Sequence, residues 1–200
     1  MSTNKLLIAT HNQDKFKQIC RLLKDTNYEL VSLSDLGITH DVAETGSTYE
    51  ENATLKAKAY AKLSGIPTIA DDSGIEIDAL NREPGIYASR YAGLNKNSQE
   101  RAEFILEKMK GVPQEQRGAQ FIVVIARVEP SGQTQLYRGV QHGFITTELR
   151  GSIFKHFIYN PIFLLPEHNK TLSELTDLGI DWHTTSARGQ ALHKLLQDLS

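Results

Sequence analysis

The alternation of apolar and amphipathic segments over residues 5–33 is the feature that most constrains the fold of this chain. The Leu-Leu-Ile run at 6–8 predicts a buried strand. Asn12 is a suitable N-cap for a helix whose apolar residues recur at helical spacing between 16 and 23, and residues 28–33 predict a second strand. A strand, a helix and a strand in this order favour parallel pairing, so we expect a parallel sheet to begin here.

The rest of the chain adds helices and one antiparallel hairpin to this opening. Thr48 and Glu51 have the spacing of a capping box, and Gly65 is the expected C-cap of the helix that follows. The remaining predicted elements are helices over 97–110 and 184–199, short strands over 67–70 and 75–80, and a hairpin of strands over 121–128 and 135–145. The expected fold class is α/β with a mixed sheet, as a single domain over residues 1–200 without an internal linker.

Charge and cysteine content exclude several classes of function. The 22 Lys and Arg residues against 24 Asp and Glu residues give a net charge of −2, without the basic surplus of a nucleic-acid binder. Cys20 is the only cysteine, so neither an intramolecular disulfide nor a cysteine-rich metal site is expected. No apolar stretch reaches the roughly 18 residues of a membrane span, and the N-terminal run is too short for a signal sequence. We therefore expect a cytoplasmic protein that binds neither membranes nor nucleic acid.

The adjacent carboxylates Asp71 and Asp72 are the strongest candidates for catalysis. They follow an apolar strand, and α/β sheets place their ligand crevices at the carboxyl ends of strands. Adjacent side chains of an extended segment point to opposite faces, so we expect one to face an ion or water and the other to brace the loop. Taken alone, Asp-Asp-Ser-Gly is equally consistent with an ordinary turn.

Residues elsewhere in the chain favour the catalytic interpretation. Glu44 lies in a polar loop before a predicted helix, and Mg²⁺ is typically held by one or two carboxylates together with phosphate oxygens and waters. Lys56 shares a helix face with Asn52, although a solvated lysine is the simpler interpretation of Lys56 alone. The backbone N–H groups after the turn at 10–15, together with Lys15, form a second candidate anion site.

Seven groups of motifs occur in collinear order over nearly the whole chain. They are Thr10-His11-Asn12 with Lys15, Glu44-Thr45-Gly46, Glu51-Asn52-Ala53 with Leu55-Lys56-Ala57, Ala70-Asp71-Asp72-Ser73-Gly74, Pro84-Gly85-Ile86-Tyr87 with Ser89-Arg90-Tyr91, Asn160-Pro161-Ile162-Phe163, and Ser186-Ala187-Arg188-Gly189-Gln190-Ala191-Leu192. Together these motifs resemble the inosine/xanthosine triphosphate pyrophosphatase family.

The resemblance implies two lobes around a central substrate cleft, usually in a homodimer. It also implies Mg²⁺-dependent hydrolysis of a non-canonical purine nucleoside triphosphate, of the ITP, XTP or dITP class, to the monophosphate and pyrophosphate in nucleotide-pool cleaning. By this resemblance Asp72 and Lys56 are catalytic, with Asp72 activating water, and Glu44 and Asp72 bind the metal. The residues that it assigns to the triphosphate are Thr10, Asn12, Lys15 and Ser73, together with Lys56.

The segments that the resemblance assigns to base recognition depart from the family pattern. The family usually has Phe-Gly-(Tyr or Trp)-Asp-Pro, whereas this chain has Phe-Ile-Tyr-Asn-Pro at 157–161. Trp182 replaces a lysine of the family, and Ala187 replaces the histidine of Ser-His-Arg. The residues expected at the base are Phe157, Tyr159, Asn160, Trp182 and Arg188, with Trp182 offering a stacking face.

Several alternatives remain open. The departures are consistent with unchanged specificity maintained by Arg188, with a shift away from inosine and xanthosine, or with lost catalysis. A nucleotide-binding sensor with weak turnover would have little reason to retain Glu44 with Asp72, and a structural protein would not be expected to carry the collinear motifs. The septum-inhibitor-type pyrophosphatase family, which resembles this one in fold and favours pyrimidines, fits the contexts at 10–12 and 186–189 less well.

Overall fold

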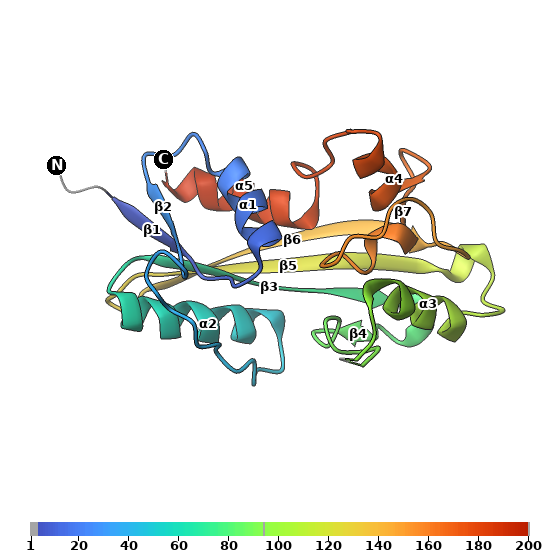
Figure 1. The fold of residues 1–200 in the computed structure, drawn as a ribbon, viewed down its shortest axis with the longest axis horizontal. Helices are drawn as coiled ribbons and strands as arrows, with labels where there is room; N and C mark the ends of the chain where they lie inside the picture. The colour runs from blue at the N-terminus through green and yellow to red at the C-terminus, as the bar shows by residue number, and fades with distance from the viewer. Residues whose placement is uncertain (1–3, 94, 200) are drawn as a thin grey trace. The chain divides into compact units, whose positions relative to one another are not determined.

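A computed structural model describes residues 4–93 and 95–199 of the chain (Figure 1). The strands form one mixed sheet in the order β2-β1-β3-β5-β6-β7-β8, and β4 pairs with β3, so the predicted α/β class with a mixed sheet is confirmed. The chain divides into two compact units. Unit 1 comprises the described residues within Met1–Ser73, Val123–Gly139 and Ala187–Ser200, and unit 2 comprises those within Gly74–Ile122 and Val140–Ser186.

The parallel part of the sheet lies in unit 1 and confirms the predicted opening. Strand β1 (Lys5–Ile8) pairs in parallel with β2 (Glu29–Ser32) on one side and with β3 (Thr68–Ile77) on the other. Helix α1 (Gln13–Leu22) connects β1 to β2, as a parallel pair requires. The β1 side chains at 6–8 are almost fully buried, which explains why these three consecutive positions are all apolar rather than alternating.

Helix α2 (Tyr49–Ser64) begins and ends where the sequence predicts. The Thr48 hydroxyl accepts a hydrogen bond from the Glu51 N–H, and the Glu51 carboxylate accepts from the N–H and hydroxyl of Ser47, one residue before the cap. Gly65 ends the helix in the left-handed conformation, with φ of 68°, which glycine adopts without steric cost. These contacts fix the N-terminal end of α2, which carries Asn52.

In unit 1, α2 covers one face of the sheet, whereas α1 and α5 (Ala187–Leu199) lie side by side on the other (Figure 1). Helix α5 begins at Ala187, three residues later than the predicted start at 184, because residues 182–186 form a turn in which the Ser186 N–H donates to Trp182 O. A Cβ atom at Gly139 would lie 1.9 Å from the Ala187 carbonyl oxygen. The absence of a side chain at Gly139 therefore allows the first turn of α5 to pack directly on β6.

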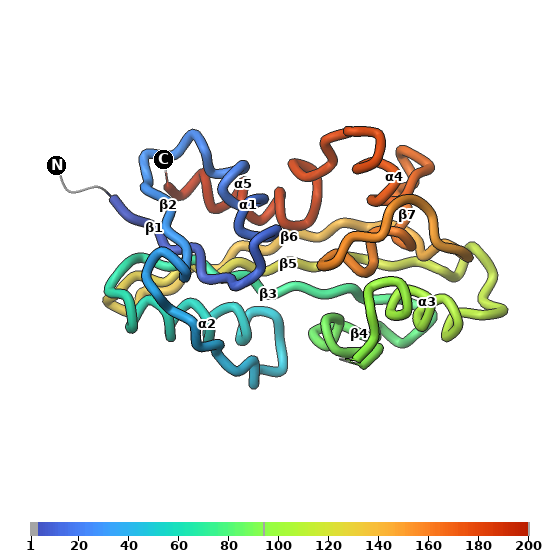
Figure 2. Tube along the Cα trace, in the orientation of Figure 1, coloured from blue at the N-terminus to red at the C-terminus, as the bar shows by residue number. Residues whose placement is uncertain are grey.

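The predicted hairpin consists of β5 (Gly118–Val128) and β6 (Thr134–Ile145). Near the turn the Glu129 N–H donates to Gln133 O, and at the opposite end the Ile145 N–H donates to Arg117 O, which is the register of an antiparallel pair. The long strands β3, β5 and β6 run side by side, and each has residues in both units (Figure 2).

Strand β3 corrects the prediction of two short strands over 67–70 and 75–80. It is continuous from Thr68 to Ile77, and the expected end of the second strand is instead a 3₁₀ helix, η1 (Asp78–Leu80). Pairing with neighbouring strands overrides the turn preference of the Asp-Asp-Ser-Gly segment. Because β1 ends at Ile8, which pairs with Ile69, β3 continues past the end of its parallel neighbour, and Asp71 and Asp72 lie on this extension.

Unit 2 has its own apolar core, which includes Ile75, Ile105, Phe163 and Leu175. The predicted helix over 97–110 is α3, with Asn97 as the N-cap of a complete capping box. Helix α3 spans Ser98–Lys108. Unit 2 also contains short elements that the sequence did not predict: β4 (Pro84–Gly85), η2 (Gln114–Gln116), η3 (Asn160–Ile162), β7 (Phe163–Leu165), β8 (Lys170–Thr171) and α4 (Leu172–Asp177). Among the described residues, no helix is long and apolar enough to cross a bilayer.

Candidate active site

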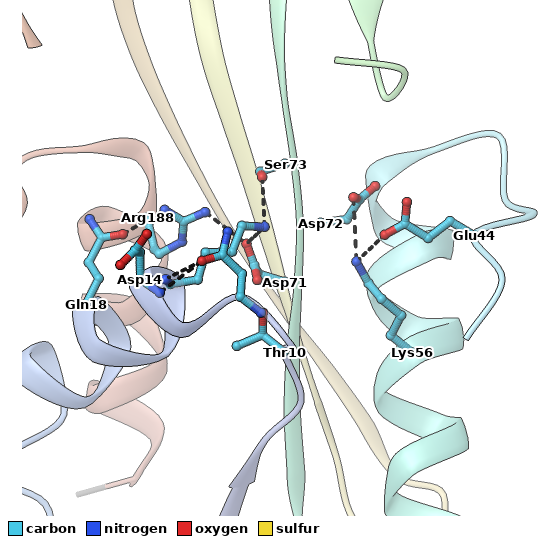
Figure 3. A network of polar contacts seen from close by, with 11 residues as sticks. Thr10, Asp14, Gln18, Glu44, Lys56, Asp71, Asp72, Ser73 and Arg188 are labelled. Carbon is cyan, nitrogen blue, oxygen red and sulfur yellow. Dashed lines mark hydrogen bonds and ion pairs between the residues drawn. The ribbon is translucent and has the colours of Figure 1, made fainter. Parts of the chain in front are cut away.

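Two sets of polar side chains flank β3 in unit 1, one on each side of the strand (Figure 3). Asp71 faces the helices α1 and α5, and Asp72 faces α2. Alternation along an extended strand produces this division, as the sequence predicts. Both carboxylates are buried, with 4% and 5% of their surface exposed, so each depends on protein groups for its electrostatic balance.

On the first side, Asp71 joins two cations that come from different helices. The Lys15 ammonium lies 3.0 Å from Asp71 Oδ2, and Arg188 Nη2 lies 3.0 Å from the same oxygen. Lys15 also donates to the Ser73 hydroxyl at 3.4 Å, because Ser73 follows Asp71 by two residues and shares its face of β3. The predicted triphosphate ligands Lys15 and Ser73 are therefore adjacent.

Arg188 belongs to this cluster through a second contact. Its Nη1 donates to Gln18 Oε1 at 2.8 Å, and Gln18 is a buried residue of α1. The Nε atom of Arg188 is buried, and no group within residues 4–93 and 95–199 accepts a hydrogen bond from it. Arg188, which the sequence analysis assigned to the base, thus has two of its donor groups in the Asp71 cluster.

The N-terminus of α1 is closed by its own cap. Asn12 Oδ1 accepts from the backbone N–H groups of Asp14 and Lys15, at 2.9 and 3.1 Å, and the Asn12 N–H donates to the Thr10 hydroxyl. The Asn12 carboxamide therefore occupies two of the N–H groups that the sequence analysis proposed as a phosphate cradle. The Lys15 side chain and the polar side chains of Thr10 and Asn12 lie at the same end of α1.

On the second side, Lys56 bridges the two carboxylates that the sequence analysis assigned to a metal. Its ammonium lies 2.6 Å from Glu44 Oε1 and 3.7 Å from Asp72 Oδ1 (Figure 3). Glu44 comes from the loop before α2, and Lys56 lies two turns into that helix. The structure therefore brings Glu44, Lys56 and Asp72 together, although they are separated by up to 28 residues in the sequence.

Asn52 is a member of this side that the sequence analysis did not select as a site residue. Its Nδ2 donates to Asp72 Oδ2 at 3.2 Å, and its Oδ1 accepts from the Gly46 N–H at 2.8 Å. The sequence placed Asn52 on the same helix face as Lys56, which was the available signal for its position.

The two aspartates differ in how readily they hold a proton. Burial acts to raise the pKa of the Asp71 carboxyl, but Lys15, Arg188 and Lys56 outweigh it and hold that pKa far below its ordinary value. Burial lowers the pKa of the Lys15 ammonium, with Asp71 opposing the decrease and Arg188 adding to it. Asp71 is therefore ionised at neutral pH, and its charge balances those of its two cationic partners.

Asp72 has the opposite character. Burial raises the pKa of its carboxyl, Glu44 and Asp71 act in the same direction, and Lys56 and the Asn52 hydrogen bond only partly offset them. For Lys56, burial acts to lower the pKa of the ammonium, yet the carboxylates of Asp71, Asp72 and Glu44 raise it above its usual value. Asp72 thus has a raised affinity for a proton beside a lysine that stays charged, which is suitable for a general base.

The residues assigned to the base by resemblance, apart from Arg188, lie in unit 2. Phe157 is half-buried, while Tyr159 and Asn160 are buried, and the Tyr159 hydroxyl donates to Ala88 O at 2.8 Å. Trp182 is buried within the core of unit 2, and its Nε1 donates to Thr176 Oγ1 at 3.0 Å. Protein atoms therefore pack the Trp182 ring, in contrast to the open stacking face expected from the sequence.

The chain matches the family model described as the Ham1 family over residues 6–198. It is 41% identical over 189 residues to a dITP/XTP pyrophosphatase from Bacillus subtilis (strain 168), covering 94% of this chain and 93% of that protein. A dITP/XTP pyrophosphatase from Clostridium perfringens (strain 13 / Type A) is 40% identical, with 98% and 97% of the two chains covered.

Solved structures agree with this match. A HAM1 protein from Coxiella burnetii has a TM-score of 0.86 at 37% identity, covering 98% of each chain. The Ham1 protein of Staphylococcus aureus has a TM-score of 0.82 at 37% identity, covering 98% of this chain and 97% of that one.

Proposed function

This chain belongs to the Ham1 family, and from that membership we propose that it hydrolyses non-canonical purine nucleoside triphosphates of the dITP/XTP class to the monophosphate and pyrophosphate. The observation that carries the proposal is the division of β3 into two polar faces. One face gathers cations for an anionic substrate around Asp71, and the other presents the proton-accepting carboxylate Asp72 beside Glu44 and Lys56.

We propose Asp72 as the general base. The oxygen of a water molecule forms a bond to a phosphorus of the anhydride between the α and β phosphates, and the bond from that phosphorus to the bridging oxygen breaks, which separates the monophosphate from pyrophosphate. The Asp72 carboxylate accepts the proton that the water loses. Asn52 engages Oδ2 of Asp72, so Oδ1, the oxygen nearer Lys56, is the one that accepts this proton. Lys56, which stays charged beside it, neutralises negative charge that develops on the phosphate oxygens.

We propose that Glu44 and Asp72 would hold a Mg²⁺ ion. Both are hard oxygen donors, and one ammonium contacts both, so they converge closely enough to share a cation. Among the described residues there is no group of three or more His, Cys, Asp or Glu side chains suited to a metal. Two carboxylates without a third fit an ion that takes its other ligands from phosphates and water, and when bound it supplies charge neutralisation at the phosphates.

The other phosphate contacts belong to the Asp71 side. Lys15 and Ser73 are adjacent there, and we assign them, with Thr10 and Asn12, to the triphosphate. Asn12 Oδ1 already accepts hydrogen bonds as the cap of α1, so the side chain of Asn12 binds the triphosphate by donating from its amide nitrogen.

We assign the base to Phe157, Tyr159, Asn160, Trp182 and Arg188 on the resemblance of their segments to the family. Trp182 acts in this set by packing its neighbours, because its ring is buried and its indole N–H is used within unit 2. Asn160 offers both a donor and an acceptor where the family usually has an aspartate, which can only accept when ionised.

Release of pyrophosphate from a broad panel of canonical, deaminated and modified triphosphates tests the proposal. We expect dITP, XTP and ITP to have the highest kcat/KM, with activity abolished by chelation and restored by Mg²⁺. Preference for another modified base would overturn the base assignment alone, whereas the absence of pyrophosphate release from every nucleotide would overturn the reaction.

We also propose a homodimer that acts in the cytoplasm, where nucleoside triphosphates are consumed. The family resemblance supports the dimer, and the single cysteine fits a reducing compartment. Light scattering coupled to size-exclusion chromatography tests the dimer, since a mass near 22.4 kDa would contradict it.

A further inference from the structure

The Asn52 carboxamide links the loop that carries Glu44 to the candidate base. Asn52 is fully buried in the first turns of α2, and both ends of its side chain are hydrogen-bonded. Its Oδ1 accepts from the Gly46 N–H at 2.8 Å, and its Nδ2 donates to Asp72 Oδ2 at 3.2 Å. One rigid, buried group therefore touches both segments.

The chemistry of the two partners fixes the orientation of this amide. The Gly46 N–H can only donate, so it requires the oxygen of the carboxamide, and an ionised Asp72 can only accept, so it requires the nitrogen. A rotation of the amide by 180° would place a donor against a donor and an acceptor against an acceptor. Asn52 therefore has a single satisfied arrangement.

Gly46 provides the close approach that this bridge requires. A Cβ atom at position 46 would lie 2.6 Å from Glu51 Cβ and 2.8 Å from Asn52 Oδ1, both too short for real contacts. The loop can reach Asn52 only because residue 46 has no side chain. Glu44 precedes this anchored residue by two positions, so the bridge also limits where the Glu44 carboxylate lies.

We propose that Asn52 is a positioning residue for the reaction. It sets the orientation of the Asp72 carboxylate and holds the loop that carries Glu44 at a fixed position relative to that carboxylate. The inference rests on the proposed function of Asp72 and Glu44. By engaging Oδ2 of Asp72, Asn52 leaves Oδ1 as the oxygen that faces Lys56. Asn52 acts through these residues and is not itself assigned to substrate or metal.

A reciprocal exchange of side chains tests the contact without relying on turnover. Asn52→Asp keeps the acceptor for the Gly46 N–H but sets a carboxylate against Asp72, whereas Asn52→Asp combined with Asp72→Asn restores a donor and acceptor pair in the reverse sense. We expect Asn52→Asp to lower Tm by about 4 °C or more at pH 8 in the wild-type background, and by less than half of that in the Asp72→Asn background. An equal decrease in both backgrounds would overturn the proposal.

Steady-state kinetics then separate positioning from general destabilisation. We expect Asn52→Asp to lower kcat about 10-fold to 100-fold below its melting range while KM stays within about threefold, because the base is misplaced and the phosphate contacts are kept. Gly46→Ala should lower kcat in the same direction, since it displaces the loop from an intact Asn52. Thr54→Asp is the matched control, because it adds the same charge to α2 two residues away, where side chains do not face each other.

The outcomes distinguish failure of the inference from failure of the proposed function. The inference fails if Asn52→Asp has the same kcat as the wild-type protein, or if Thr54→Asp loses as much kcat as Asn52→Asp does. In either case, turnover by the wild-type protein still supports the proposed function. If the wild-type protein releases no pyrophosphate, the proposed function fails, and the Tm comparison still decides whether Asn52 and Asp72 are coupled.

Discussion

Asp71 and Asp72 are consecutive residues of β3, and their carboxylates bind different partners on opposite sides of the strand. Asp71 contacts Lys15 and Arg188, whereas Asp72 contacts Asn52 and Lys56. The pKa of Asp71 is held far below the ordinary value by its cations, and that of Asp72 is raised chiefly by burial. One residue therefore organises the cationic side of the site, and its neighbour is suited to accept a proton.

Removal of the proton-accepting carboxylate tests the role of Asp72. We expect Asp72→Asn to lower kcat by about 10²-fold to 10⁴-fold, the usual contribution of a general base, with KM changed only a few fold. Pyrophosphate release measures both constants, and Tm verifies folding. Asp78→Asn removes an exposed carboxylate from η1 as a control. Equal kcat values in Asp72→Asn and the wild-type protein would contradict the assignment.

Asp71 should contribute mainly to stability, and in a pH-dependent way. Asp71→Asn leaves the partly buried cations Lys15 and Arg188 without their anion, so we expect the free energy of unfolding at pH 7 to fall by about 3 kcal/mol. Because the folded pKa of Asp71 is lowered, its contribution is fully present above the unfolded value of about 3.9 and is lost progressively as the pH falls from there through the lowered folded pKa.

Urea denaturation of the wild-type protein and Asp71→Asn at pH 7 and near pH 3 measures this difference. The stability difference between the two proteins should be largest at pH 7 and smaller near pH 3, where protonation of the unfolded chain has begun to reduce it. A difference in stability that is the same at both pH values would show that the Asp71 charge is not responsible.

Glu44 should determine the dependence on metal. We expect Glu44→Gln to increase the Mg²⁺ concentration for half-maximal activity by about tenfold or more, because a ligand charge is lost while the loop keeps its length. Titration of activity with Mg²⁺ gives this value. Glu50→Gln is the control, since Glu50 lies on α2 but pairs with Arg138 of β6 rather than with the site. If both variants follow the wild-type titration curve, Glu44 does not bind the metal.

Arg117 should affect stability without affecting chemistry. It is 2% exposed, and its guanidinium donates to the carbonyl oxygens of Ile145, Met109, Val112 and Thr146 in unit 2. Arg117→Met would remove all four of these hydrogen bonds, so we expect a loss on the order of 3 kcal/mol in the free energy of unfolding. Arg82→Met, which removes an exposed ion pair with Glu76, should cost about 1 kcal/mol or less.

Chemical denaturation of both arginine variants, with kcat measured well below their melting temperatures, provides the comparison. A lower kcat in fully folded Arg117→Met would contradict a purely structural role.

The sequence by itself determined the elements whose signals are local. The apolar run at 6–8, the cap at Asn12 and the helix between Thr48 and Gly65 specify their own backbone, because hydrophobic period and end capping act within a few residues. Strand alternation likewise determined that Asp71 and Asp72 face opposite sides. The collinear motifs identified the family, and 40–41% identity to the dITP/XTP pyrophosphatases confirms it.

Only the tertiary structure decided which distant residues meet. Asp-Asp-Ser-Gly has the composition of a turn, yet strand pairing makes it continuous strand, and Arg188 reaches Asp71 across 117 residues of sequence. Trp182 is buried by the packing of unit 2, and Asn52 becomes a bridge only where the Gly46 loop and β3 both approach α2. Contacts of this kind depend on packing between segments far apart in the chain, and no local pattern encodes them.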